Sequence, residues 1–274
     1  MFKISKETCN KDGICATSCP AGIIDFQKGE FPVPVDDAEK VCIRCGHCVA
    51  VCPTGSFSHN DIPVEQCHPL NKDLDLSVEQ AEQFLKSRRS IRAYKNKSVP
   101  RDDLAKLIDI ARYAPSGHNN QCAKWLVIDD RDLLGELSGI VIDWMGWMIE
   151  NMPEIAISLH MDRAVKRWEN GYDVVLRDAP SLIIAYAEKN NVLAPTTCTI
   201  AMTYLELAAA RMGLGGCWAG YFNSAAASFP PMKKALSLPK DQACFGSMMV
   251  GYPKFKYHRM PLRNSPDVTW RGSS

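Results

Sequence analysis

Four cysteines with a compact, regular spacing form the clearest chemical motif of the sequence. They are Cys42, Cys45, Cys48 and Cys52, the last followed by Pro53. The C-x2-C-x2-C-x3-C-P spacing is typical of iron–sulfur ligation, in which three neighbouring thiolates hold one cluster and the fourth reaches another. A zinc ribbon usually requires two separated C-x2-C pairs instead. The spacing therefore predicts iron–sulfur clusters and one-electron chemistry.

An incomplete copy of this motif precedes it. Aligned on Cys19, which is also followed by a proline, its ligand positions hold Cys9, Asp12 and Cys15, so an aspartate replaces the second thiolate. A carboxylate is a harder and weaker iron ligand than a thiolate, so this second cluster is expected to be either [4Fe–4S] or a [3Fe–4S] cluster that has lost one iron. Cys67 is an alternative ligand, although an uninvolved thiol is the simpler interpretation. Crossed ligation between the copies assigns one [4Fe–4S] cluster to Cys19, Cys42, Cys45 and Cys48, and the other cluster to Cys9, Asp12, Cys15 and Cys52.

A basic segment after the first long predicted helix could bind an anion. It contains Arg88, Arg89, Ser90 and Arg92. Guanidinium groups bind phosphate oxygens in a bidentate manner, and the hydroxyl adds another donor. On these residues alone, a phosphate site and a solvated basic helix end are equally good interpretations.

Three further segments have compositions that could line a site for a planar ligand. The turn 114–121 carries small hydroxyl and amide side chains, and 213–220 is expected to be a flexible glycine-rich turn that lets the backbone approach a ring. A basic segment follows the last predicted strand and extends from Gly251 to Arg263. Each is weak evidence alone, and the four segments together are more informative.

The elements that must position these residues alternate between helices and strands. Ser77, with Gln80 at the capping-box spacing, predicts the start of a helix. Apolar periodicity predicts further helices over 104–114, 133–168 with a break near Pro153, and 197–212 ending at Gly213. Strands are predicted over 125–128, 181–187 and 244–250. This alternation indicates an α/β or α+β domain of about 200 residues behind a small cysteine-rich domain.

The overall composition narrows the class of protein. The chain has 274 residues, 46% hydrophobic and 23% charged, with a net charge of +1, which favours neither nucleic acid nor an anionic membrane surface. Its N-terminus has no apolar stretch typical of a signal peptide, and the apolar run 133–152 is interrupted by acidic residues. Seven of the twelve cysteines lie between Cys9 and Cys52. We therefore expect a cytoplasmic protein. In such a protein, metal ligation or a reactive thiol is a better interpretation of a cysteine than a disulfide.

The motifs resemble those of two known families. Residues 1–60 resemble the two-cluster bacterial ferredoxins, and residues 78–274 resemble the FMN-dependent nitroreductase family through the four segments described above, in that order. The expected domains are an iron–sulfur domain over 1–60, a connector over 61–77 and an FMN-binding domain over 78–274. The expected fold is α+β, with a central antiparallel sheet flanked by helices in a dimeric flavoprotein domain, preceded by the small ferredoxin-like domain.

The resemblance also implies roles for the candidate residues. The arginine segment and Arg259 would hold the phosphate and ribityl chain of FMN, and Gly215 and Gly216 would lie beside the reactive edge of the flavin. The turn residues Pro115, Ser116, Asn119 and Gln121 would meet the flavin of the partner subunit. Members of the family are homodimers with exchanged terminal segments, which would explain the unpatterned tail 253–274.

The implied activity is that of an FMN-dependent oxidoreductase in which no side chain is catalytic, because the cofactor carries the chemistry. A low-potential donor, either a ferredoxin-like protein or NAD(P)H, would reduce the clusters, and FMN would pass the electrons to a small acceptor such as a nitro compound or quinone. No G-x-G-x-x-G motif for a nicotinamide follows a strand. Alternatives are reductive dehalogenation, flavin breakdown, or a non-catalytic electron relay. No nucleic acid or membrane partner is expected.

Overall fold

The computed structural model describes residues 1–272, and the chain divides into two compact units. The first unit contains residues 1–75 together with the separate segment 115–121. The second contains residues 76–114 and the chain from residue 122 onward. All the predicted metal ligands lie in the first unit, and the arginine segment and the glycine-rich stretch lie in the second.

The first unit is assembled from short elements around a small apolar core. Its first and last strands pair antiparallel, with Phe2 opposite His59, and a second pair of strands forms between them. Ile24, Val49 and Phe57 are among the buried side chains of this core. The elements are β1 (Phe2–Ile4), α1 (Ile14–Thr17), β2 (Ile24–Asp25), β3 (Val33–Pro34), α2 (Ala38–Val41), α3 (His47–Ala50), β4 (Phe57–His59) and the 3-10 turns η1 (Val64–Gln66), η2 (Lys72–Leu74) and η3 (Gly117–Asn119).

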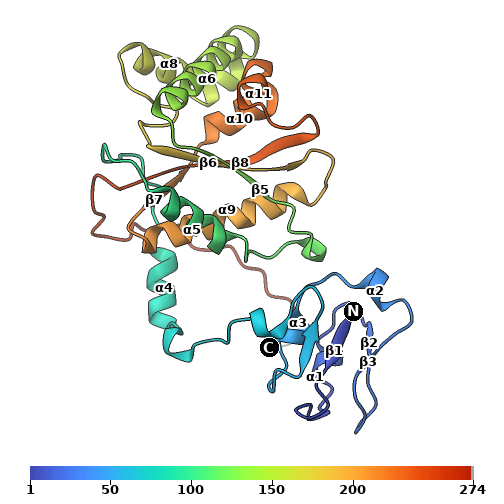
Figure 1. Ribbon diagram of the computed structural model, residues 1–274. Helices are drawn as coiled ribbons and strands as arrows, with labels where there is room; N and C mark the ends of the chain where they lie inside the picture. The colour runs from blue at the N-terminus through green and yellow to red at the C-terminus, as the bar shows by residue number, and fades with distance from the viewer. Residues whose placement is uncertain (273–274) are drawn as a thin grey trace. The chain divides into compact units, whose positions relative to one another are not determined.

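The second unit is built on a four-stranded antiparallel sheet with helices on both faces (Figure 1). The strand order is β5-β6-β8-β7, so the two longest strands, β6 and β8, lie in the centre. The strands are β5 (Lys124–Ile128), β6 (Ser181–Glu188), β7 (Gly215–Trp218) and β8 (Gln242–Gly251). The helices are α4 (Val78–Lys86), α5 (Arg101–Ala111), α6 (Arg131–Asn151), α7 (Pro153–Ser158), α8 (Met161–Glu169), α9 (Ala194–Arg211), α10 (Gly220–Ser228) and α11 (Pro230–Leu236).

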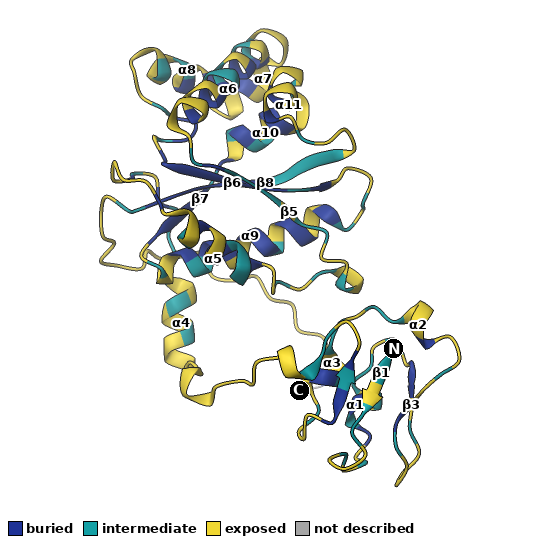
Figure 2. Cartoon of the chain, viewed as in Figure 1, coloured by how far each residue is buried: buried dark blue, intermediate teal, exposed yellow. Residues whose placement is uncertain are grey.

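The sheet separates two apolar cores because successive side chains of a strand point to opposite faces. On β6, Leu182 and Ile184 pack in the core shared with α6, α8, α10 and α11, whereas Ile183 and Ala185 pack in the core shared with α5 and α9. The central strands are accordingly buried along most of their length (Figure 2). This arrangement confirms the expected α+β class with a central antiparallel sheet.

Most predicted elements are confirmed, with small shifts at their ends. Helix α4 begins after Ser77 with both hydrogen bonds of the capping box to Gln80. The long helical region breaks before Pro153, and α9 is followed by Gly213 in the left-handed conformation, with φ of 71°. The expected flexible turn over 213–220 is wrong in its centre, because residues 215–218 form β7 against β8. Helices α10 and α11 were not predicted.

No helix within residues 1–272 is long and apolar enough to cross a membrane.

The segment that follows β8 has no regular secondary structure. From residue 254 to residue 272 the chain has neither helix nor strand, and its side chains are exposed, including Leu262 and Trp270. The sequence expectation of an unpatterned tail is confirmed for these residues.

Candidate functional site

The two cysteine motifs fold into two copies of one backbone. Arg44, Gly46 and Gly55 of the second copy have φ angles of 52°, 74° and 63°. The matching positions of the first copy, Lys11, Gly13 and Gly22, have 55°, 73° and 62°. In each copy the second of these residues is the N-cap of a one-turn helix that carries the third ligand position, Cys15 or Cys48. The internal repeat seen in the sequence is therefore also a repeat of backbone conformation.

One cavity of the first unit is lined by four cysteines drawn from both copies. They are Cys19, Cys42, Cys45 and Cys48, the set expected from crossed ligation. Burial raises the pKa of Cys48 to about 11. A buried thiol of that kind ionises when a metal replaces its proton, because thiolate is the metal-binding form. The Cys42 sulfur already accepts a hydrogen bond from the backbone N–H of Arg44 at 3.4 Å.

A second cavity of the same unit is lined by the other predicted ligand set, Cys9, Asp12, Cys15 and Cys52. One carboxylate oxygen of Asp12 accepts a hydrogen bond from the backbone N–H of Ile14 at 3.1 Å, and this contact fixes the side chain at the start of α1. Burial opposes ionisation of Cys52, but hydrogen bonds from the Thr54 hydroxyl and nearby backbone groups outweigh it and lower the pKa of the thiol. The donors in both cavities therefore suit iron–sulfur clusters.

Cys67 lies outside both cavities. Its side chain is exposed, and its thiol donates to the carbonyl oxygen of Pro63 at 3.5 Å. The residues that line the two cavities do not include it. The interpretation of Cys67 as an uninvolved thiol agrees with this position.

The arginine segment follows α4 and is anchored against strand β7. The Ile91 N–H donates to the Gly216 carbonyl oxygen at 2.9 Å. Arg88 donates through one nitrogen, Nη1, to the Glu206 carboxylate at 2.7 Å and to the Ser90 hydroxyl at 3.4 Å. Glu206 has 7% of its side chain exposed and Arg88 has 27%, so this ion pair is largely removed from solvent. Arg88 is therefore held in place by Glu206 and Ser90.

Gly215 permits this close approach of the arginine segment to the sheet. A Cβ atom on Gly215 would overlap the side chain of Ile91 and push the segment away from β7. Gly216 is close to other neighbours, because a Cβ atom there would lie 2.6 Å from the sulfur of Met248 on β8. Both glycines therefore lie in a packed strand, and not in the flexible turn expected from the sequence.

Positive charge gathers around Cys217 and Tyr94, next to the arginine segment. Burial raises the pKa of the Cys217 thiol, while Arg92 and Arg177 act to lower it through their charges. The same two arginines oppose the effect of burial on the Tyr94 hydroxyl, whose pKa is also raised. Arg88, Arg92 and Arg177 bring three positive charges to this region, and the carboxylates of Glu206 and Asp178 offset part of them. The remaining positive charge favours an anion such as a phosphate.

Two members of this charged group were missed from the sequence. Glu206 had a signal, because it is the one charged residue in the apolar stretch 194–210 of α9. Arg177 lies in a loop with φ of 57° and had no recognisable motif. Arg89 places its guanidinium over the ring of Tyr257, 6.0 Å from the centroid, whereas Arg259 is exposed on the tail.

The amide-rich turn belongs to the first unit. Asn119 donates through its side-chain amide to the carbonyl oxygens of Ile43 and Arg44, at 3.2 and 2.8 Å. The Ser116 hydroxyl accepts a hydrogen bond from the Gln121 N–H at 3.0 Å, which closes the turn. Asn119 and Gln121 both have left-handed backbone angles, with φ of 53° and 44°. Asn119 therefore holds the loop between the predicted ligands Cys42 and Cys45, a contact the sequence did not predict.

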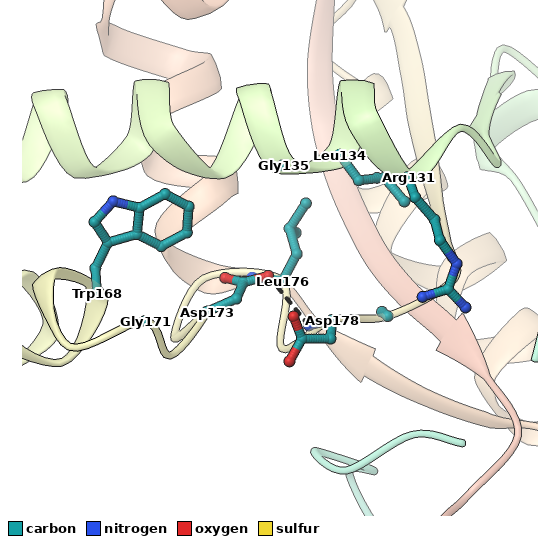
Figure 3. Close-up of a pocket in the computed structure, with 9 residues that line it drawn as sticks. Arg131, Leu134, Gly135, Trp168, Gly171, Asp173, Leu176 and Asp178 are labelled. Carbon is teal, nitrogen blue, oxygen red and sulfur yellow. Dashed lines mark hydrogen bonds between the residues drawn. The ribbon is translucent and has the colours of Figure 1, made fainter. Parts of the chain in front are cut away.

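Another pocket of the second unit lies between α6, α8 and the loop before β6, and is shown in Figure 3. Arg131, Trp168 and Asp178 are among its lining residues. Asp173 accepts hydrogen bonds from the backbone N–H groups of Val175, Leu176 and Asp178, so its carboxylate stabilises the loop itself. The pocket contains none of the residues predicted to bind FMN.

Comparison with known proteins matches each of the two parts of the chain to a known family. Residues 85–252 match the model of the nitroreductase family, and residues 8–57 match that of the 4Fe-4S dicluster domain. A putative NADH dehydrogenase/NAD(P)H nitroreductase of Archaeoglobus fulgidus is 25% identical over 69% of this chain and 96% of its own length. A protein named ferredoxin 7Fe from Hydrogenibacillus schlegelii is 33% identical over 27% of this chain and 95% of its own length.

A solved structure supports the same fold for the larger unit. The nitroreductase with bound FMN from Bacteroides fragilis aligns with a TM-score of 0.57 and 22% identity, covering 70% of this chain and 99% of that one. The match to the family model extends over more than half of the 274 residues. The chain therefore belongs to the nitroreductase family and carries an N-terminal ferredoxin-type dicluster domain.

Proposed function

We propose that this protein is a flavin oxidoreductase in which two iron–sulfur clusters supply electrons to FMN, and FMN reduces a small acceptor such as a nitro compound or quinone. The observation that carries the proposal is the pair of cavities in the first unit, each lined by four predicted iron ligands. A simple flavin reductase that takes hydride from a nicotinamide has no need of them. Iron–sulfur clusters carry one electron at a time.

FMN is proposed to bind at the arginine segment of the second unit. Arg88, Arg92 and Arg177 supply positive charge there, and Glu206 holds Arg88 in a fixed orientation. Bound FMN supplies the chemistry that joins one-electron donors to two-electron acceptors. Ser90 would add a hydroxyl donor to the phosphate, and Arg89 and Arg259 would add charge from the edge of the site. Gly215 leaves room for Ile91 of this segment, and the Gly216 carbonyl oxygen accepts a hydrogen bond from the Ile91 N–H.

The amide-rich turn is proposed to contact the flavin of the partner subunit. Pro115, Ser116, Asn119 and Gln121 were expected to approach a flavin, and Asn119 also holds the loop between two ligands of the all-cysteine cluster. We therefore propose that the all-cysteine cluster is the one that delivers electrons to FMN. A homodimer, with the tail 253–274 contacting the partner subunit, would place this turn at the partner's flavin.

The second cluster is proposed to be a [3Fe–4S] cluster or a [4Fe–4S] cluster that readily loses an iron. Asp12 replaces one thiolate, and one of its carboxylate oxygens is already engaged by the Ile14 N–H. The ferredoxin relative bears the name 7Fe, which agrees with one complete and one three-iron cluster. The electron donor is proposed to be a low-potential ferredoxin-like protein or NAD(P)H in the cytoplasm.

The test is an anaerobic steady-state assay of the FMN-loaded protein with reduced ferredoxin and NAD(P)H as alternative donors. The acceptors are a nitroaromatic, a quinone and a halophenol, the last covering reductive dehalogenation. A quinone takes up two electrons and two protons to become a hydroquinone, which is easily followed by absorbance. We expect turnover with the nitroaromatic or the quinone.

The matched variant is Cys45→Ala, which removes one ligand of the all-cysteine cluster. It should lose ferredoxin-driven turnover but keep turnover when dithionite reduces the flavin directly. Equal ferredoxin-driven rates in both proteins would exclude the proposed electron route. Failure to reduce any small acceptor, combined with electron transfer to a partner protein, would identify a relay and not an enzyme.

A further inference from the structure

His59 is a buried histidine beside the all-cysteine cavity, and no role follows for it from the cysteine motifs. It ends strand β4, has 5% of its surface exposed, and lines the cavity with Cys42. Strand pairing opposite Phe2 fixes its backbone, and two hydrogen bonds between residues 59 and 62 close the turn that follows. The imidazole is therefore held in one place.

The hydrogen bonds of the ring determine which nitrogen carries its proton. Nδ1 lies 3.0 Å from the backbone nitrogen of Asp61, and that N–H can only donate. Nδ1 must therefore accept and carry no proton. The neutral ring then has its proton on Nε2, which lies 3.7 Å from the Cys42 sulfur. An iron-bound Cys42 is a thiolate and can only accept, so Nε2–H donates to the sulfur.

We propose that His59 raises the reduction potential of the all-cysteine cluster by donating this hydrogen bond to the Cys42 thiolate. Hydrogen bonds to ligand sulfurs are among the factors that set the potential of such clusters. The reduced cluster carries one more negative charge than the oxidised cluster, so a donor stabilises the reduced form more. The inference rests on the ligation of that cluster by Cys42 given under the proposed function.

The repeat supplies a natural comparison for this position. His59 lies seven residues after Cys52, and Phe26 lies seven residues after Cys19, the matching cysteine of the first copy. Phenylalanine has no donor. The hydrogen bond is thus an addition to one half of the repeated backbone. Cys42 accepts it together with the Arg44 N–H, so that sulfur receives two donors.

The test is an EPR-monitored redox titration of the anaerobic, full-length protein with both clusters assembled. His59→Phe introduces the residue of the other copy, and His59→Gln keeps an N–H donor. For His59→Phe we expect the ratio of reduced to oxidised all-cysteine cluster at a given potential to fall by up to about tenfold. That corresponds to a midpoint lower by up to about 59 mV for one electron. In His59→Gln the midpoint of the all-cysteine cluster should lie close to the wild-type value. The second cluster should keep its midpoint potential in both variants.

His47→Gln is the matched control, because His47 lines the same cavity and forms no hydrogen bond to a cysteine within the described residues. Its midpoint should equal that of the wild type. An unchanged midpoint in His59→Phe, or equal shifts in His59→Phe and His59→Gln, would overturn the inference.

A measurement on the unaltered site covers the case in which His59→Phe does not assemble. In protein labelled with 15N-histidine and carrying His47→Gln, pulsed EPR of the reduced cluster should detect coupling to one histidine nitrogen. Absence of that coupling would overturn the inference even with both clusters present. Absence of the cluster signal itself from wild-type protein would instead overturn the ligation on which the inference rests.

Discussion

Replacing Glu206 by glutamine tests whether the ion pair with Glu206 holds Arg88 in the proposed phosphate site. The change keeps the size of the side chain and removes the charge that Arg88 faces at 2.7 Å. Two unit charges at that distance attract by about 6 kcal/mol at an effective dielectric constant of about 20. Screening at the partly exposed Arg88 and the cost of burying Glu206 both reduce this value. We expect a net coupling free energy of about 2 kcal/mol.

A double-mutant cycle measures that coupling directly. The variants are Glu206→Gln, Arg88→Met and the two combined, and urea unfolding of the FMN-free protein gives the free energies. Each single variant should lose about 2 to 3 kcal/mol, because each leaves a polar or charged partner unpaired in a largely buried place. The double variant should lose about as much unfolding free energy as the worse single variant, because neither charge then remains without its partner.

An exposed ion pair of equal length provides the control. Arg101 and Asp129 also approach to 2.7 Å, but 84% of the Arg101 side chain is exposed. The same cycle at that pair should give a coupling below about 1 kcal/mol. If the Glu206 cycle gave a coupling as small as that of the exposed pair, solvent would screen both pairs equally, and the argument that Glu206 fixes Arg88 would be refuted.

Three other changes probe the cofactor sites and the thiols. Asp12→Cys should raise the iron content by one atom per chain and replace a three-iron EPR signal by a four-iron signal; an identical spectrum would mean that Asp12 is not a ligand. Arg92→Ala should weaken FMN binding about tenfold to a hundredfold by removing a charged donor to the phosphate, as measured by fluorescence titration, while the surface control Arg101→Ala should not. Alkylation of the cluster-loaded protein at pH 8 should modify the exposed Cys67 first and spare Cys244, because burial raises the pKa of Cys244 to about 11; mass spectrometry showing equal modification would contradict this.

Local signals account for the elements that the sequence predicted well. The capping box at Ser77 and Gln80 lies within one turn of α4, and the apolar run of β6 is buried from both faces of the sheet. Strand β7 was missed because nothing in residues 215–218 alone distinguishes a strand from a glycine-rich turn. Its conformation depends on pairing with β8 and on contact with Ile91, more than a hundred residues earlier.

The same distinction holds for the candidate sites. The cysteine spacing is local, so both ligand sets could be written from the sequence, and each set lines one cavity. The partners of these residues are distant in the chain. Glu206 meets Arg88 from α9, and Asn119 reaches the loop between Cys42 and Cys45 from the segment after α5. Such contacts follow from tertiary packing, for which a single sequence carries no direct record.

The repeated backbone of the first unit gives the protein an internal comparison between two versions of one loop. The two copies share left-handed residues at matching positions, so one backbone conformation carries two different sets of side chains. Asp12 of the first copy matches Cys45 of the second, and His59 of the second copy matches Phe26 of the first. Exchanging these residues between the copies would show how much of the difference between the two cavities comes from the side chains alone.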